Sequence, residues 1–191
     1  MNLFYLDEDM DKCAEYHVDK HIVKMPLEAA QLLCTAIWVD HVLGFVPRAL
    51  NKEESKILNE EKAKIKDLPM EERPLTPYLP MMYNHPCTIW TRSSLDNFEW
   101  THCYANALND EYHYRYGKQH KSARDLLYYL STPPKNIPIV DQTPFPLAMK
   151  SNPECMFEDA VKSYRAFYQT KQERFKMVWK KREVPSWFVY K

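Results

Sequence analysis

Glycine is almost absent from this chain, because only Gly44 and Gly117 occur among its 191 residues. Nucleotide-binding folds of the Rossmann and P-loop types need glycines clustered at a phosphate-binding turn, and sheet-rich folds need glycine at many tight turns. We therefore exclude the first two folds and disfavour the third. The sequence predicts a mainly α protein, one compact helical domain over residues 1–191. It also predicts a short N-terminal extended arm and a proline-rich charged insertion or long connection at 47–82.

Hydrophobic periodicity and capping residues predict where the helices lie. One helical pattern runs from about Met10 to Val39, and Pro26 interrupts it. Proline removes a backbone donor and clashes with the preceding turn, so we expect a kink or two abutting helices there. Gly117 suits the C-terminal stop of a central helix. Further helices are expected over residues 52–66, 95–116, 122–130 and 158–181.

The segment HVDKHIVKMPLEAAQ, residues 17–31, carries polar groups at steps of four, three, four and three residues. Such spacing places the groups on one side of a continuous helix. A lysine partly buried beside histidine and a second cation has a lowered pKa and can act as a nucleophilic amine. Lys24 has Glu28 one turn away to serve as the carboxylate. The catalytic candidates are therefore His17, Lys20, His21, Lys24 and Glu28.

Two other interpretations of this row stay open. His17 and His21 are one turn apart and can share a metal ion, with a third ligand supplied by His85, His120 or Glu28. The sequence has no HExxH motif, and we assign neither a metal nor a cofactor. Alternatively, a lysine and a glutamate four residues apart form an ordinary ion pair at the edge of a core helix.

Two further segments bring histidine, aromatic and basic residues together near helix ends: YNHPCTIWTR, residues 83–92, and EYHYRYGKQHKS, residues 111–122. The first can present groups to a phosphate or a base, or can hold a core tryptophan beside an arginine that reaches the surface. Cations in the second suit a helix C-terminus whatever the function. Together with the C-terminal end they supply the substrate-binding candidates, which are Asn84, His85, Trp90, Arg92, Glu111, Arg115, Lys118, His120, Lys121, Lys181, Arg182 and Trp187.

The C-terminal end is basic although the formal net charge of the chain is zero. From Lys162 to Lys191, nine lysines and arginines stand against two acids, and aromatic residues are interleaved with them. Cations neutralise phosphates and aromatic rings stack on bases, so this composition suits a nucleic-acid partner. An amphipathic terminal helix with a solvated basic face is the alternative.

Cysteine usage and the N-terminus indicate the compartment. The five cysteines form no CxxC pair, and the first residues are acidic where a secretory signal would be basic. No run reaches the roughly 20 apolar residues of a membrane span. We expect a cytoplasmic protein with reduced thiols and without a membrane partner.

Five segments along the chain share a pattern with known proteins: HVDKHIVKMPLEAAQLL, NHPCTIW, NDEYHYRYGKQHKS, TPFPLAM and KKREVPSWF. Through them nearly the whole chain resembles a family of small helical proteins common in tailed-phage genomes. The resemblance implies a phage protein that works in the host-cell cytoplasm.

The order of features is also similar, more remotely, to the pyrimidine-dimer DNA glycosylases of the phage endonuclease V type. These are compact all-α enzymes with an N-terminal arm and a first long helix that carries a histidine and then a proline, as His17 and Pro26 do here. The start and end of their central helix resemble His85, Trp90, Arg92, Arg115 and Gly117. Their ending resembles Pro185, Trp187 and Phe188, which follow Lys180, Lys181 and Arg182.

The catalytic groups depart from that family pattern. Those enzymes attack the sugar C1′ with an N-terminal amine exposed after Met removal, helped by a glutamate on the first long helix. Here residue 2 is Asn2, and Lys24 stands near the place of the glutamate. If the chemistry is retained, the resemblance implies that the amine is Lys24 or Lys20 and the carboxylate is Glu28.

We therefore expect a phage-type enzyme acting on DNA or a nucleotide, glycosylase/lyase-like or base-modifying, with an amine and a carboxylate on its first long helix. One alternative is a helical nucleotide hydrolase or transferase, with or without a metal. Another is a non-enzymatic module that binds DNA or a host protein. The oligomeric state stays open.

Overall fold

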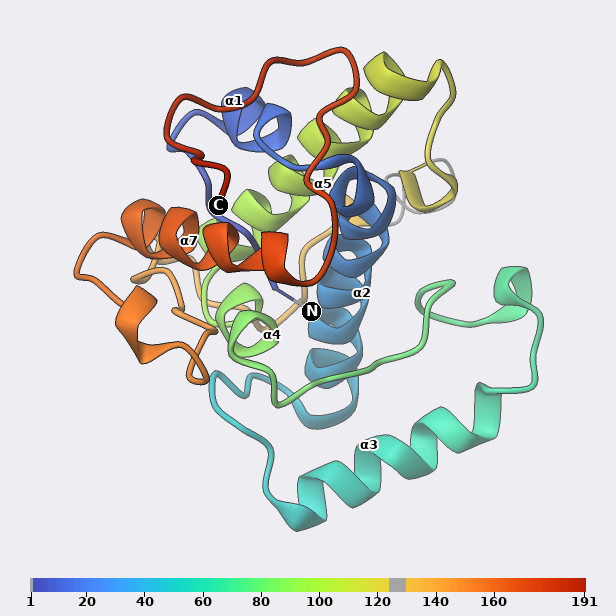
Figure 1. Ribbon diagram of the computed structural model, residues 1–191. Helices are drawn as coiled ribbons and strands as arrows, with labels where there is room; N and C mark the ends of the chain where they lie inside the picture. Colours follow the sequence, from blue (N-terminus) through green and yellow to red (C-terminus); the bar gives the residue numbers. More distant parts are fainter. Residues whose placement is uncertain (1, 124–129) are drawn as a thin grey trace.

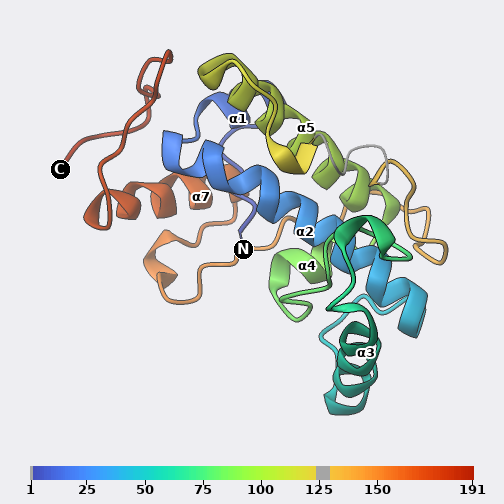
Figure 2. The same cartoon turned by 90° about the vertical axis from the view of Figure 1, so that its right-hand side faces the viewer.

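Helix α2 (Asp19–Leu43) runs through the middle of the molecule, with α5 (Leu95–Tyr116) along one side and α4 (Pro86–Thr91) along another (Figures 1 and 2). The computed structural model describes residues 2–123 and 130–191, and within these ranges the chain is mainly helical and has no strand. The predicted fold class, a mainly α compact domain, is confirmed.

The N-terminal arm, residues 2–6, is part of the core. The Phe4 ring stacks on His21 of α2 and contacts Phe167 and Tyr168 of α7 (Ala160–Gln169). Leu3 and Leu6 are also fully buried. The arm therefore joins the first long helix to the C-terminal part of the chain.

The predicted helix from Met10 to Val39 begins at Met10 as expected, with Asp9 as its cap, but it is not continuous. The chain forms a short α1 (Met10–Glu15), leaves helical geometry at residues 16–18, and begins α2 at Asp19. Val18 is extended with ψ of 157° and its N–H donates to the Tyr168 hydroxyl at 2.9 Å. A contact with the far end of the chain therefore sets this break, and local periodicity does not reveal it.

Pro26 lies inside α2, so the alternative of two abutting helices is wrong. A proline in a helix interior costs about 3 kcal/mol. Ile22, Met25, Ala29 and Leu33 of α2 are all buried in the same core, on both sides of the proline. Each large buried aliphatic side chain contributes roughly 1.5–3 kcal/mol, so their packing outweighs the lost hydrogen bond.

Helix α2 extends past the predicted end at Val39 to Leu43, and it is more apolar than expected from the sequence. By length and composition alone it could cross a membrane, since an 18-residue window has a mean hydropathy of 1.4. However, 72 % of that window is buried inside the fold, as in the core helix of a globular protein.

The charged segment 47–82 carries α3 (Lys52–Ile65), which confirms the helix expected at 52–66. Asn51 and Glu54 form a reciprocal capping box at its start. Figure 1 shows α3 along the lower edge, apart from the other helices. It is attached through a small cluster of its own, in which Leu58 packs with Trp38 and its neighbours at the end of α2.

The helix predictions between residues 83 and 130 are confirmed only in part. Helix α5 is confirmed between the Ser94 cap and Gly117, whose φ of 70° is the left-handed conformation that favours glycine. The short α4 was not predicted, although Pro86 at its first turn suits a helix start. Most of the helix expected at 122–130 lies outside the described residues.

The helix expected over 158–181 is more than twice as long as the helix that forms, which has 10 residues. Helix α7 ends at Gln169, a short 3₁₀ turn η3 (Thr170–Glu173) follows, and the rest of the chain is irregular. Trp179 is buried and its indole N–H donates to the Tyr16 carbonyl at 2.8 Å. Burying this residue and Phe188 against α1 and its neighbours requires the chain to leave the helix.

Candidate functional site

A cavity of about 450 Å³ opens beside the first turns of α2. Its walls come from five parts of the chain that are far apart in sequence: the N-terminal arm, α2, the turn before α4, the loop around residues 148–152, and the end of α7 with η3. The lining residues with polar or charged side chains are Asn2, His21, Lys24, Glu28, His85, Ser151, Asn152, Lys171 and Arg174. We call this cavity the α2 pocket.

Lys24 and Glu28 form the pair that the sequence predicts, because α2 continues through Pro26. Lys24 Nζ lies 2.7 Å from Glu28 Oε1. The lysine side chain is 63 % exposed and the glutamate only 11 %, so the carboxylate is at the wall while the amine is at the mouth.

His21 also lines the α2 pocket, where it is held between aromatic rings. Its Nδ1 lies 2.7 Å from the Tyr168 hydroxyl, which itself accepts the Val18 N–H. In the tautomer that carries the ring proton on Nε2, the hydroxyl donates its one O–H to His21 Nδ1. Burial, together with the charges of His17 and Lys24, lowers the pKa of His21 to about 3. His21 is neutral at pH 7 and can donate a hydrogen bond to a ligand.

His85 faces the same cavity from the start of α4. It caps this helix with an extended backbone, as its position before Pro86 predicts, and its Nδ1 accepts the Cys87 N–H at 3.2 Å. Burial lowers the pKa of His85 to about 4, against the opposing effect of Glu28. His85 is thus a second neutral imidazole beside the carboxylate.

Lys171 is one of the polar pocket residues that the sequence analysis missed, together with Asn2, Ser151, Asn152 and Arg174. It lies in η3 and is only 7 % exposed. Its Nζ is 3.4 Å from the centroid of the Phe167 ring, which gives the ammonium a cation–π contact. Burial and the charge of Arg174 lower the pKa of Lys171 to about 8, with a smaller opposing effect of Cys155. A buried lysine with this pKa is a candidate for amine chemistry.

The charge of the α2 pocket is positive. Three cations, Lys24, Lys171 and Arg174, line it together with one acid, Glu28. A cavity lined mainly by one sign of charge concentrates ligands of the other sign. The α2 pocket therefore suits a phosphate-bearing ligand.

His17 lies outside the pocket, although the sequence places it at the head of the row. It falls in the turn between α1 and α2 and is completely buried. Its Nδ1 donates to the Cys13 carbonyl at 2.7 Å, and its Nε2 therefore accepts the Tyr104 hydroxyl at 2.8 Å. Burial is the main cause that lowers the pKa of His17 to about 3. Its role in this structure is to join α1 to α5.

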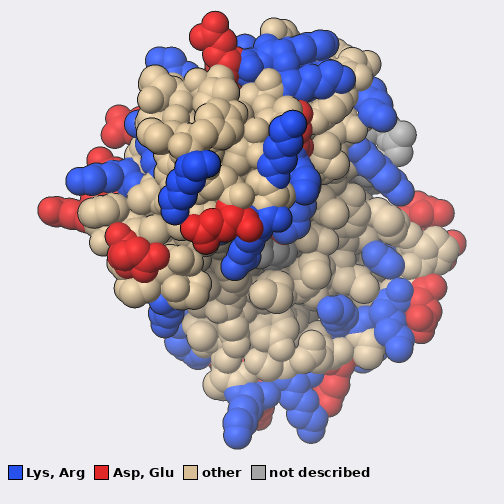
Figure 3. All heavy atoms as spheres, in the orientation of Figure 1, with Lys and Arg blue, Asp and Glu red and all other residues tan. Residues whose placement is uncertain are grey.

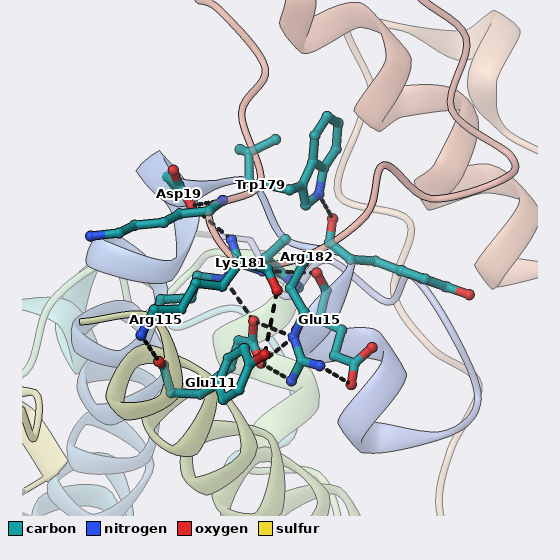
Figure 4. Close-up of polar contacts among 12 residues, drawn as sticks. Glu15, Asp19, Glu111, Arg115, Trp179, Lys181 and Arg182 are labelled. Atoms are coloured by element: carbon teal, nitrogen blue, oxygen red, sulfur yellow. Dashed lines mark hydrogen bonds and ion pairs between the residues drawn. The ribbon is translucent and has the colours of Figure 1, made fainter. Parts of the chain in front are cut away.

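Arg115 and Glu111 belong to a second group of charges at the first turn of α2, shown in Figure 4. Arg115 is fully buried and lies 2.6 Å from Glu111 and 2.9 Å from Asp19. Arg182 reaches the other oxygen of Glu111 at 2.7 Å and Glu15 at 3.0 Å. We call these five residues the Arg115 network. It fastens the C-terminal segment to α1, α2 and α5, and it lines no part of the α2 pocket.

Arg92, Trp90 and Asn84 also serve contacts within the fold. The Arg92 guanidinium donates to the carbonyls of Val46, Tyr83 and Arg48. Trp90 is buried and donates to the Thr143 carbonyl at 3.1 Å. The Asn84 side chain pairs with the backbone of Leu50. The Arg92 and Asn84 contacts tie the segment after α2 to the region of α4, and the Trp90 contact ties α4 to the loop around Thr143. None of the three side chains lines the pocket.

The remaining candidates surround the pocket or lie away from it. Lys20 is exposed and stands 4.9 Å above the Phe175 ring, which is part of the pocket rim. His120 contacts the Val23 carbonyl at 3.1 Å on the α5 side of α2, and Lys118 and Lys121 are exposed near it.

Trp187 is half-buried, with its ring 5.8 Å from that of Tyr16 and beneath the Arg165 guanidinium. Lys181 and Arg182 lie over the Tyr114 ring at the end of α5. Figure 3 shows lysines and arginines gathered at the top of this face, over the C-terminal segment, whereas acids and bases alternate over α3.

The structure does not bring a metal-ligand set together. Across residues 2–123 and 130–191, no three His, Cys, Asp or Glu side chains are grouped to hold a metal ion. His17 and His21, the proposed pair of ligands, are instead hydrogen-bonded to tyrosines.

Comparison of the chain with models of protein families, with curated proteins and with solved structures gave no match. A function can therefore be inferred only from the chemistry of the structure itself, and in particular from the α2 pocket.

Proposed function

We propose that the protein is an enzyme that acts on DNA or a nucleotide at the α2 pocket, by glycosylase- or lyase-type chemistry at the sugar C1′. The observation that supports this most is the meeting of amines and one carboxylate, Lys24, Lys171 and Glu28, in a single positive cavity. Two neutral imidazoles, His21 and His85, stand beside them as proton donors or acceptors.

The chemistry needs an amine and a base close together. On an abasic site the neutral amine adds to the C1′ aldehyde, and water leaves to form an imine. Glu28 then removes a proton from C2′, the C3′–O bond breaks, and the 3′ phosphate departs with its electron pair. Water finally adds to the imine carbon and frees the amine. Atoms and electrons balance without a cofactor.

The pocket also suits such a substrate in size and charge. Its volume of about 450 Å³ lies within the range of roughly 300–1,000 Å³ that is usual for small-molecule sites. A nucleotide extruded from a strand fits a cavity of this class, and unstacking costs only a few kcal/mol for a damaged or abasic position. Arg174 is exposed at the rim, where it can meet a flanking phosphate.

Borohydride trapping tests the proposal directly. The full-length protein is mixed with duplex DNA that contains one abasic site, and the imine is reduced to a stable adduct. We expect a cross-linked species that forms only with abasic DNA. Absence of both an adduct and strand cleavage would overturn the proposal.

The carboxylate is tested by Glu28→Gln, which keeps the shape of the side chain and removes its basicity. We expect strand cleavage to slow by about 100-fold, the lower end of the usual range for general acid–base catalysis. The matched control is Glu60→Gln, the same change on the exposed helix α3. Equal rates for both variants would remove Glu28 from the mechanism.

A second candidate function is an enzyme of free nucleotides, a hydrolase or transferase, and the concave shape of the α2 pocket favours it. This alternative predicts that nucleoside monophosphates raise the melting temperature while duplex DNA does not. A binding module without catalysis predicts that Lys24→Ala and Glu28→Ala leave DNA affinity intact. Thermal shift and DNA titration at two salt concentrations separate the three functions.

A further inference from the structure

We propose that Lys171, not Lys24, supplies the amine that bonds to the sugar carbon, and that Lys24 holds a phosphate of the same substrate. This inference rests on the proposed function, because it names the reacting group of that site. It assigns the bond-forming amine to the C-terminal segment, far along the chain from the Lys24–Glu28 pair.

The two lysines differ in their surroundings. Lys24 lies 2.7 Å from Glu28 and 63 % of its side chain is exposed. Lys171 is 7 % exposed, lines the α2 pocket and rests on the Phe167 ring. Within the described residues, no carboxylate lies within ion-pair distance of Lys171. The buried amine thus faces the cavity without an anionic partner that would hold it as an ammonium ion.

A nucleophilic amine must be neutral when it attacks. The pKa of Lys171 is lowered to about 8, chiefly by burial and then by Arg174, so roughly a tenth of the molecules carry the free amine at pH 7. Phe167 and the Cys155 thiol oppose this effect, since a ring face stabilises the ammonium and the thiol raises the pKa. His21 and Lys24 are the other titratable groups that share this wall of the pocket.

The positions of Lys171, Glu28 and Lys24 in the α2 pocket indicate a separate role for each side chain. Lys171 adds to the C1′ aldehyde and releases water, which gives the imine. Glu28 accepts the C2′ proton. Lys24 is at the mouth of the pocket, where a phosphate of the substrate can replace or share the carboxylate as its partner. The substrate class is therefore a sugar phosphate with a reactive C1′ carbon, either within DNA or free.

Peptide mapping of the trapped adduct tests the assignment. Wild-type protein is reduced with borohydride on abasic DNA, digested with nuclease and trypsin, and analysed by mass spectrometry. We expect the modification on Lys171 and a missed tryptic cleavage after it. An adduct on Lys24, Lys20 or any other amine overturns this inference but keeps the proposed function, whereas the absence of both an adduct and strand cleavage overturns the proposed function itself.

Charge-conserving substitution gives an independent measurement. Lys171→Arg keeps the positive charge but cannot form an imine, so we expect the trapped yield to fall at least about 100-fold while DNA affinity changes less than threefold. Lys24→Ala should show the reverse, with a weaker affinity and an adduct still on residue 171. The control is Lys176→Arg, an exposed lysine of the same segment. Trapping by Lys171→Arg at the wild-type yield overturns the inference, and if this variant does not fold, the wild-type peptide map decides.

Discussion

Two groups of charged side chains border the N-terminal half of α2, and they differ in how their charges are balanced. The Arg115 network joins two arginines to three acids through pairs of 2.6–3.0 Å and is mostly buried. The α2 pocket surrounds a cavity of about 450 Å³ with three cations and one acid. Both groups are drawn from α2 and from the C-terminal segment, so they share their supporting elements.

The difference shows how to separate structural from functional charges in one fold. In the Arg115 network each charge is satisfied by a partner on another helix or on the C-terminal segment, and removing Arg115 or Glu111 takes an ion-pair partner from a buried ion. In the α2 pocket the excess of positive charge faces an open volume, and a ligand can complete it. Residue type alone does not distinguish them, since both use arginine or lysine four residues from glutamate.

Removing Arg115, the centre of the Arg115 network, should have the largest effect on stability. We expect Arg115→Ala to lower the free energy of unfolding by about 3–5 kcal/mol, because Glu111 is left buried without its closest cation. Urea denaturation measures this from the midpoint at constant slope. Arg48→Ala is the control, since its pair with Glu54 is exposed and should contribute at most about 1 kcal/mol. A loss for Arg115→Ala no larger than that of the control would contradict the role of the network.

Lowering the pH should lower the free energy of unfolding through two buried histidines, His17 and His21. His17 and His21 have pKa values of about 3 in the folded protein, below the ordinary value of 6.5, so the unfolded chain binds more protons as the pH falls from 6.5 toward 3. Stability is therefore complete above pH 6.5 and declines below it. At pH 5 we expect a loss of about 2 kcal/mol for each histidine relative to pH 7.

Urea titrations at the two pH values check this decline. His21→Gln should remove its share of the pH dependence, whereas His113→Gln, an exposed position near the end of α5, should not. A wild-type protein equally stable at pH 7 and pH 5 would show that the buried rings are not held neutral.

Substitutions in the α2 pocket should change the affinity for DNA and not the stability of the fold. We expect Arg174→Gln to weaken DNA binding by about 1 kcal/mol and to reduce the slope of log affinity against log salt by about one, as the loss of one phosphate contact does. Fluorescence anisotropy at salt concentrations from about 50 to about 200 mM gives both quantities. Arg48→Gln, on the opposite part of the fold near α3, should leave the slope unchanged.

Charges outside both groups should have the smallest effect. Lys56 and Glu60 lie 3.8 Å apart on α3 with side chains 76 % and 59 % exposed. We expect Lys56→Ala to change the unfolding free energy by less than about 0.5 kcal/mol and to leave trapping unchanged. A larger change in either measurement would mean that α3 takes part in the site.

Local rules predicted the parts of the fold that depend on neighbouring residues. The capping residues Asn51 and Ser94 and the stop at Gly117 locate α3 and α5. The four-residue step from Lys24 to Glu28 also predicts their contact, because one helix carries both. Helix caps, C-terminal glycines and four-residue spacings depend on only a few neighbouring residues, so they can be recognised in the sequence.

Contacts between residues far apart in the sequence determine the features that the sequence analysis did not predict. His17 follows the helical spacing but leaves the row, because the Tyr168 hydroxyl holds Val18 in an extended conformation. Lys171 gave no local signal beyond its place in a basic, aromatic segment, and its burial depends on Phe167 and the loop that completes the cavity. Arg92 and Arg115 have phosphate-binding chemistry, but carbonyl and carboxylate partners within the fold engage them.

The N-terminal arm has a consequence for the order in which the protein is made. Asn2 and Phe4 form one wall of the α2 pocket, and Phe175 forms another, so the cavity joins residues that are synthesised early with residues that are synthesised much later. Phe4 finds its ring partners Phe167 and Tyr168 only after those residues have been synthesised. During translation, α1 to α5 can pack around α2 while the pocket still lacks two of its walls. The cavity is therefore complete only after the residues of α7 and η3 have been synthesised.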